Sequence, residues 1–160
     1  MSETFNFHDF GHGVTARVMV AADIAWFARD VCAEDAAELA AYWGEDVERE
    51  VREAFDASRA AWLVCCHGEC VAAAGFCHID EGEAVWMLTT TALARHKRLF
   101  ARHYRAVYEG LLGLTGEPRR PLLAHVLKDY ERCLAPLWKF LRVTPLRDAG
   151  AARILRLEVP

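Results

Sequence analysis

The spacing of apolar side chains separates an N-terminal helical region from a central region of strands. Residues 14–20 are rich in β-branched side chains and end at an Ala-Ala-Asp sequence, which predicts a first strand. Apolar residues then recur at helical spacing, which predicts three helices, at residues 24–31, 35–44 and 46–55. Asp23, Asp35 and Asp46 stand where each of these helices would begin and could cap it.

The central region changes to strand character. Apolar runs at residues 61–66, 70–79 and 84–89 are separated by Gly-containing turns, which predicts three consecutive antiparallel strands. The spacing of apolar and arginine residues at 93–112 predicts the longest helix, with an apolar face and a basic face. The basic face carries Arg95, Arg98, Arg102 and Arg105, with Lys97 and His103 nearby.

The C-terminal part returns to short elements. A buried strand is predicted at residues 122–127, a helix at 130–141, a short strand at 143–144 and a last strand at 152–159. Pro136 removes one backbone hydrogen bond from that helix. The order of elements predicts an α+β (α/β mixed) fold.

Composition narrows the class of protein. A chain of 160 residues has the size of one domain, and its net charge of −4 argues against a strongly basic nucleic-acid binder. The sequence has neither an 18-residue apolar run nor a basic signal-peptide region, so we expect a cytoplasmic protein without a membrane span. The six cysteines lie in apolar segments, where reduced and buried thiols are expected.

The order of elements is similar to that of the GNAT-type N-acyltransferase fold, a single domain with a mostly antiparallel central sheet flanked by helices. Residues 17–23 resemble the junction of the first strand and first helix in that superfamily. Residues 85–93, followed by Arg95-His96-Lys97-Arg98 and Phe100, resemble the GNAT-like proteins of tailed phages and prophages. The resemblance predicts a GNAT-like domain at residues 14–160 after an N-terminal leader at residues 1–13.

The resemblance implies acetyl-CoA or another acyl-CoA as cofactor. Such proteins bind its pyrophosphate on N–H groups at the start of the long helix, where a Gly-rich turn lets the phosphates approach. Residues 89–95 occupy that place here and contain no glycine. The side chains of Thr90, Thr91 and Leu93 would stand where the pyrophosphate lies, and Thr91 could cap the helix instead. The candidate cofactor-binding residues are Met87 and Leu88, for the acyl oxygen, with Thr89, Thr90, Arg95 and Arg98.

The catalytic positions that the resemblance implies are only partly filled. A tyrosine on the predicted helix at residues 130–141 would protonate the leaving thiolate, but residues 134–141 contain none, and Trp138 is a donor only. Tyr130 is the candidate acid, with core packing as its alternative. Glu83 is the preferred candidate for the base, and Glu81 and His78 are the other candidates. The alternative for Glu83 is a solvated carboxylate at the end of a strand.

A metal site is not predicted. Cys65, Cys66, His67 and Cys70 cluster at a hairpin, but neighbouring strand residues face opposite sides and a second Cys pair is missing. His8, Asp9 and His12 lie in a Gly-containing leader that does not preorganise them.

Two functions remain open at this point. The first is a phage or prophage GNAT-fold protein with a degenerate acyl-CoA site and a structural or interaction role, including association with a virion. Its partner, a phage protein or a second copy, would meet the basic helix face or the aromatic leader residues Phe5, Phe7 and Phe10. The second is an active N-acyltransferase that acts on a small amine or a protein amine, with Glu83 or a water molecule as base.

Overall fold

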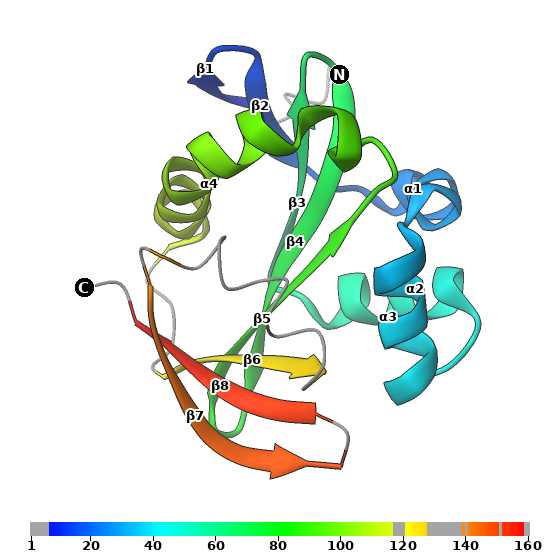
Figure 1. Ribbon diagram of the computed structural model, residues 1–160, viewed down its shortest axis with the longest axis vertical. Coiled ribbons are helices and arrows are strands. Elements are labelled where there is room, and N and C mark those ends of the chain that lie inside the picture. The colour runs from blue at the N-terminus through cyan, green and yellow to red at the C-terminus, as the bar shows by residue number, and fades with distance from the viewer. Residues whose placement is uncertain (1–6, 117–120, 128–138, 140, 151, 159–160) are drawn as a thin grey trace.

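The computed structural model describes residues 7–116, 121–127, 139, 141–150 and 152–158. One eight-stranded sheet runs through the described part of the molecule, in the order β1-β2-β3-β4-β5-β6-β8-β7 (Figure 1). Neighbouring strands are antiparallel except β5 and β6, which are parallel. The strands are β1 (Phe7–Gly11), β2 (Val14–Val18), β3 (Ala60–Cys66), β4 (Glu69–Ile79), β5 (Gly82–Thr89), β6 (Leu122–Leu127), β7 (Arg142–Ala149) and β8 (Ala152–Glu158).

Helices cover both faces of the sheet (Figure 1). A 3₁₀ turn, η1 (Ala21–Asp23), leads into α1 (Ile24–Asp30), α2 (Ala33–Tyr42) and α3 (Val47–Ala57) on one face. The other face carries α4 (Leu93–Thr115). No helix in the described ranges is long and apolar enough to cross a membrane.

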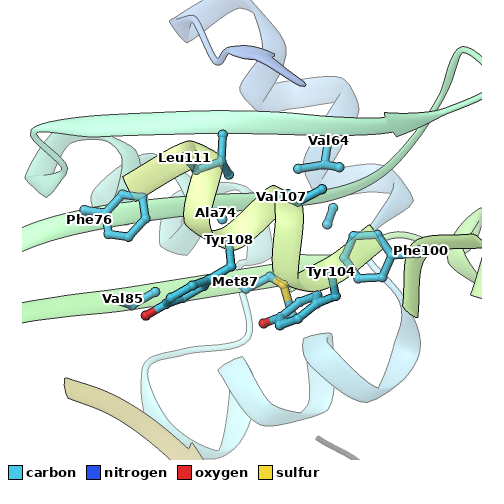
Figure 2. A pocket seen from close by; sticks show the side chains of 11 residues that line it. Val64, Ala74, Phe76, Val85, Met87, Phe100, Tyr104, Val107, Tyr108 and Leu111 are labelled. Atoms are coloured by element: carbon cyan, nitrogen blue, oxygen red, sulfur yellow. The ribbon is translucent and has the colours of Figure 1, made fainter. Parts of the chain in front are cut away.

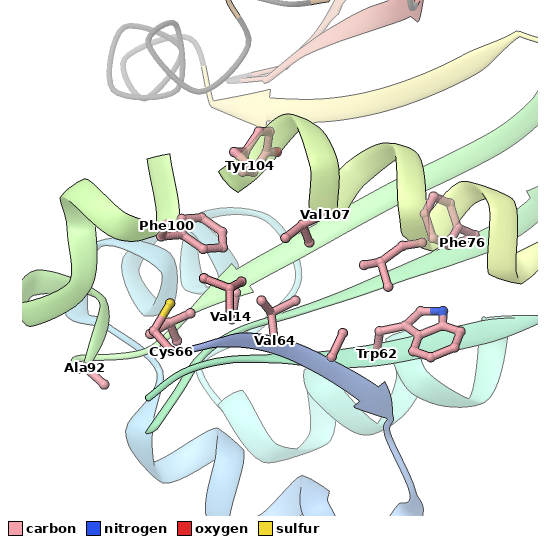
Figure 3. Close-up of a cluster of buried hydrophobic side chains, with 13 residues drawn as sticks. Val14, Trp62, Val64, Cys66, Phe76, Ala92, Phe100, Tyr104 and Val107 are labelled. Atoms are coloured by element: carbon pink, nitrogen blue, oxygen red, sulfur yellow. The ribbon is translucent and has the colours of Figure 1, made fainter. Parts of the chain in front are cut away.

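Each face has its own hydrophobic core. The α4 core joins Phe100 and Val107 to Trp62 and Val64 of β3, as Figure 3 shows. The α1–α3 core joins Phe27 and other helix residues to the opposite face of the same strands. Strand alternation supplies both cores, because successive side chains of β3 point to opposite faces.

The predicted strand order in the middle of the chain is confirmed. β3 and β4 form a hairpin whose turn residues, His67 and Gly68, have φ of 49° and 84°. Two consecutive positive φ angles define the two-residue turn that matches the twist of a hairpin. The cap at Asp46 is also confirmed, because its carboxylate accepts the Arg49 N–H at 3.1 Å.

Two predicted boundaries differ from the structure, and one predicted helix is not tested by it. Phe7–Gly11, assigned to a leader, form β1, which pairs with β2; the glycines that suggested an irregular segment make the turn between them. β7 extends well beyond residues 143–144 and includes Pro145, which is tolerated because β7 is an edge strand. The predicted helix at 130–141 lies outside the described residues, apart from residues 139 and 141.

Candidate functional site

β5 and β6 diverge from a common base. Their parallel pairing is limited to Glu83 with Leu122 and Ala84 with Leu123. Among the described residues, Val85–Thr89 have no pairing partner on β6, and Figure 1 shows β6 turning away from β5. The two strands therefore enclose a V-shaped opening in an otherwise continuous sheet.

Helix α2 holds the two sides of this opening apart. Near its start, the Asp35 carboxylate accepts the Thr89 N–H and hydroxyl of β5, at 2.5 and 2.7 Å. At its end, the ring of Trp43 stacks on His125 of β6, with centroids 6.3 Å apart and planes 10° apart. The eight helical steps between Asp35 and Trp43 span about 12 Å, whereas paired strands are about 4.8 Å apart. The separation between the strands is thus built into the fold.

The backbone of Met87 faces the opening. In an antiparallel strand, the backbone polar groups of alternate residues point to the same side. On β5 this side is fixed by Glu83, whose N–H donates to Pro121 O at 3.1 Å, and by Thr89, whose carbonyl accepts Cys32 N–H at 2.9 Å. Met87 has the same parity, and Leu88 has the opposite one, toward β4. Of the two predicted positions for holding an acyl oxygen, only Met87 can present its N–H there.

The start of α4 differs from the prediction in its side chains. Thr90, predicted to stand in the phosphate path, is buried: its hydroxyl donates to Cys70 O at 2.6 Å and accepts the Ala92 N–H at 3.2 Å. Leu93 packs against the α4 core. Thr91 is exposed, and its side chain does not cap the helix. The predicted obstruction therefore reduces to Thr91, and the predicted Thr91 cap is wrong, because the N–H of Ala92, just before the helix, binds the hydroxyl of Thr90 instead.

An open, basic groove of about 560 Å³ lies along the first turns of α4. Arg95 and His96 share the carboxylate of Glu69, at 2.7 and 2.5 Å, and these two partners lower the pKa of Glu69 to about 2. No ion pair with a described carboxylate involves Lys97 or Arg98. Arg98 is therefore better placed than Arg95 to meet an anionic ligand. The groove is lined by His67, Ala94, Arg95, His96, Lys97, Arg98 and Leu99.

A second cavity, between α4 and the sheet, is too small for a ligand. Figure 2 shows Val85 and Met87 of β5 facing Tyr104 and Tyr108 of α4 around this space. Its volume is about 30 Å³, enough for about one water molecule. It belongs to the packing of the core.

Glu83 lies at the closed base of the opening. Its side chain is fully buried and forms an ion pair with Arg59, which also donates to Thr115 O at 2.6 Å. The expected solvent-facing carboxylate is therefore wrong, because Arg59 compensates its burial. Glu83 also lies four residues from Met87, about 13 Å along the strand. This geometry favours a structural role over that of a base.

The other predicted acid–base candidates are placed as follows. Glu81 pairs with Arg147 at 2.8 Å, and His78 Nε2 lies 3.8 Å from the Glu83 carboxylate. Tyr130 lies outside the described residues. His103, predicted beside the basic face of α4, is buried instead and contacts Leu99 O at 3.0 Å.

His125 was not singled out by the sequence. It follows the divergence point on β6, and burial, with the nearby Arg147, lowers its pKa. The neutral imidazole, which can accept a proton, therefore prevails at neutral pH. In the sequence, His125 is a single histidine within the apolar run at residues 122–127. Trp43 lies near the end of the predicted helix at residues 35–44 and gives no sign of a contact with His125. Their contact joins residues far apart in the chain, so no local pattern could reveal it.

Metal ligands do not gather in the described part of the chain. No group of three or more His, Cys, Asp or Glu side chains there could hold a metal ion. Cys65 and Cys66 face opposite sides of the sheet, as predicted: Cys66 enters the α4 core, and Cys65 does not. Of the five cysteines described, only Cys66 is buried, so the expectation of buried thiols holds for it alone.

The architecture is that of known acetyltransferases. The GNAT domain of S. lividans PAT superposes with a TM-score of 0.63 at 15% identity, over 89% of each chain. AAC(6')-Ib in complex with ribostamycin and coenzyme A has a TM-score of 0.64 at 14% sequence identity, over 92% of this chain and 93% of that one. RimL, a ribosomal L7/L12 alpha-N-protein acetyltransferase, has a TM-score of 0.64 at 9% identity, over 98% of this chain and 95% of that one.

These likenesses establish the GNAT fold, so the predicted α+β fold class is confirmed. No family model matches the sequence. No curated protein matches it either.

Proposed function

We propose that this chain is an acyl-CoA-dependent N-acyltransferase whose acyl group enters the opening between β5 and β6. The observation that carries the proposal is the Met87 N–H, which faces that opening from a strand edge without a β6 partner among the described residues. The three solved neighbours reported above are acetyltransferases by name or by fold domain, and AAC(6')-Ib was solved with coenzyme A.

The reaction would use the Met87 N–H to stabilise charge. An acceptor amine attacks the thioester carbonyl, and the carbonyl oxygen gains negative charge as the tetrahedral intermediate forms. A fixed backbone donor at this oxygen is worth a rate factor of about 10²–10³. The intermediate then expels the CoA thiolate and leaves the amide. The proton of the attacking amine passes to water or, through water, to the neutral ring of His125 on the β6 side.

The nucleotide end of the cofactor would lie in the basic groove on α4. Lys97 and Arg98 are exposed there, and Ala94 adds no bulk to the first turn. A helix start also attracts phosphate through its N–H groups and its dipole. The groove thus offers charge where the usual glycines are replaced by alanine and threonine.

The test is calorimetric titration with acetyl-CoA. Wild type is expected to bind, and the pair Lys97→Ala, Arg98→Ala is expected to raise the dissociation constant about tenfold, the loss of one charge-assisted contact. Arg102→Ala is the matched control, since Arg102 is an exposed arginine on the same helix beyond the groove. If the Lys97→Ala, Arg98→Ala pair and Arg102→Ala bind acetyl-CoA with equal affinity, the groove is not part of the binding site. If wild type does not bind acetyl-CoA, the proposal is contradicted.

A second candidate is a GNAT-fold protein of the phage or prophage type that acts by interaction and without acyl-CoA. The observation that favours it is the glycine-free start of α4, where Thr90 already occupies the Ala92 N–H. Its contact surface would be the exposed arginines of α4 or the N-terminal strand β1, on which Phe7 is exposed. Acetyl-CoA binding in the titration above decides against it, and self-association in sedimentation, abolished by Arg98→Glu with Arg102→Glu, would support it.

A further inference from the structure

Two thiols face each other across the β3–β4 hairpin. Cys65 and Cys70 are direct cross-strand partners, one pair beyond the His67-Gly68 turn. The α-carbons of such partners lie about 4.5–5.5 Å apart, within the range of about 4.4–6.8 Å that a disulfide spans. Cys66 points into the α4 core, so Cys65 lies on the other face, together with Cys70. Both thiols are only partly buried.

The surroundings distinguish Cys65 from the other thiols. The neighbouring Cys70 thiol, and then the positive charge of Arg17 on β2, lower the pKa of Cys65 to about 7, against the opposing effects of burial and Asp23. Burial raises the pKa of both Cys32 and Cys66. Cys65 is therefore partly thiolate at neutral pH, and the thiolate is the reactive form.

We propose that Cys65 and Cys70 form a redox-active dithiol that reacts with low-molecular-weight disulfides and closes to an intramolecular disulfide. The Cys65 thiolate attacks the disulfide, forms a mixed disulfide and releases one thiolate. The Cys70 sulfur then attacks Cys65, displaces the second thiolate and passes its proton to a released thiolate. The two cysteines lose two electrons, and the small disulfide is reduced to two thiols.

The second step follows from the first. The interaction with the Cys65 thiol, then burial, and then the charge of Cys65 raise the pKa of Cys70. Once Cys65 is in a mixed disulfide, it carries no charge, so its contribution ends and Cys70 loses its proton more easily, although burial still opposes this step. The pair thus has an attacking and a resolving thiol with distinct roles.

The hairpin that carries the dithiol also holds the start of α4. Cys70 O accepts the Thr90 hydroxyl at 2.6 Å, and the neighbouring Val71 O accepts the Thr90 N–H at 3.0 Å. Glu69, on the other side of Cys70, binds Arg95 and His96. Closing the disulfide is therefore expected to change the affinity for acetyl-CoA, a consequence that rests on the proposed function.

The test uses the full chain, reduced and then treated with oxidised glutathione. Wild type should lose two hydrogens without retaining glutathione, and peptide mapping should join Cys65 to Cys70. Cys70→Ser should retain one glutathione on Cys65, because the resolving thiol is gone. Cys77→Ser, a partly buried thiol at the far end of β4, is the control and should behave as wild type. A disulfide elsewhere, or no adduct on Cys65 in Cys70→Ser, would overturn the proposal.

A second measurement needs no substitution. Limited alkylation of reduced wild type should modify Cys65 before the other cysteines, with a rate that rises with pH and levels off above about 7. Cys65 reacting no faster than Cys77 would contradict the assignment. Titration of the reduced and the oxidised protein with acetyl-CoA separates the two proposals. If neither form binds, the proposed acyltransferase function is contradicted. The dithiol proposal is decided independently, by whether the mapped disulfide joins Cys65 to Cys70.

Discussion

The carboxylate of Asp35 accepts two hydrogen bonds from Thr89, one from its amide N–H at 2.5 Å and one from its hydroxyl at 2.7 Å. This contact ends the strand that faces the opening and fixes it to α2. Asp35 is buried, so the donors of Thr89 have no water to replace the carboxylate. The shape of the opening therefore depends on a residue outside it.

Replacing Asp35 by Asn should destabilise the protein. The amide offers one acceptor and brings a donor toward two donors, so we expect a loss of about 2–3 kcal/mol in the free energy of unfolding. Urea denaturation measures it. Glu34→Gln, an exposed neighbour on the same helical turn, is the control and should change stability by less than about 0.5 kcal/mol. Equal losses in the two variants would show that the Thr89 contact is not stabilising.

The buried ion pair at the base of the opening makes a second prediction. Glu83→Gln leaves Arg59 without its charged partner and should cost about 3 kcal/mol. Glu81→Gln, which removes an exposed partner of Arg147, should cost less than about 1 kcal/mol. At a temperature where both variants are folded, Glu83→Gln should keep most of its acyl-transfer rate. A large loss of rate in folded Glu83→Gln would restore Glu83 as the base.

Local sequence patterns predict individual elements but not the contacts between distant ones. The β3–β4 hairpin and the long α4 helix could be predicted because each depends on local turn residues or on apolar spacing. The burial of Glu83 could not, since its compensating Arg59 precedes a different strand. The same holds for Asp35: its position suggested a helix cap, but its carboxylate binds a strand 54 residues away.

The choice between Met87 and Leu88 has the same cause. Both residues lie in one predicted strand, and sequence alone does not say which residues have backbone groups directed away from the neighbouring strand. Register with β4 and the contacts of Glu83 and Thr89 decide it. β1 was missed because its turn, rich in glycine, looked like the end of a leader.

Stability below neutral pH should depend on Glu69. Its pKa is lowered to about 2 by hydrogen bonds from Arg95 and His96, whereas an unfolded chain has a glutamate pKa of about 4.3. A lowered carboxylate pKa adds stability above the unfolded value, and this contribution is lost as pH falls toward the folded one. The stability difference between wild type and Glu69→Gln should therefore shrink between about pH 5 and 2.

Denaturant titrations at several pH values test this prediction. Glu109→Gln serves as a control, because Glu109 pairs with Arg105 on the exposed side of α4. A stability difference for Glu69→Gln that stays constant from neutral pH down to about pH 3 would be inconsistent with the lowered pKa.

The Met87 N–H can be removed without altering the pairing of β5 with β4. Met87→Pro deletes a donor that faces the opening, and proline is tolerated where the N–H has no ladder partner. We expect kcat to fall by about 10²–10³. Met87→Ala keeps the N–H and separates the effect of the side chain, so its kcat should stay within about tenfold of wild type. Equal kcat values for the two variants would argue against a role for this donor.

The most direct measurement of the central claim is a titration of isotopically labelled, reduced protein with acetyl-CoA, followed through the backbone amide signals. The account predicts that the Met87 amide changes most on β5 and that amides of residues 94–98 change with the same dissociation constant. Amide signals that stay unchanged at millimolar acetyl-CoA, or that change only away from β5 and α4, would contradict acyl-CoA binding in the opening between β5 and β6.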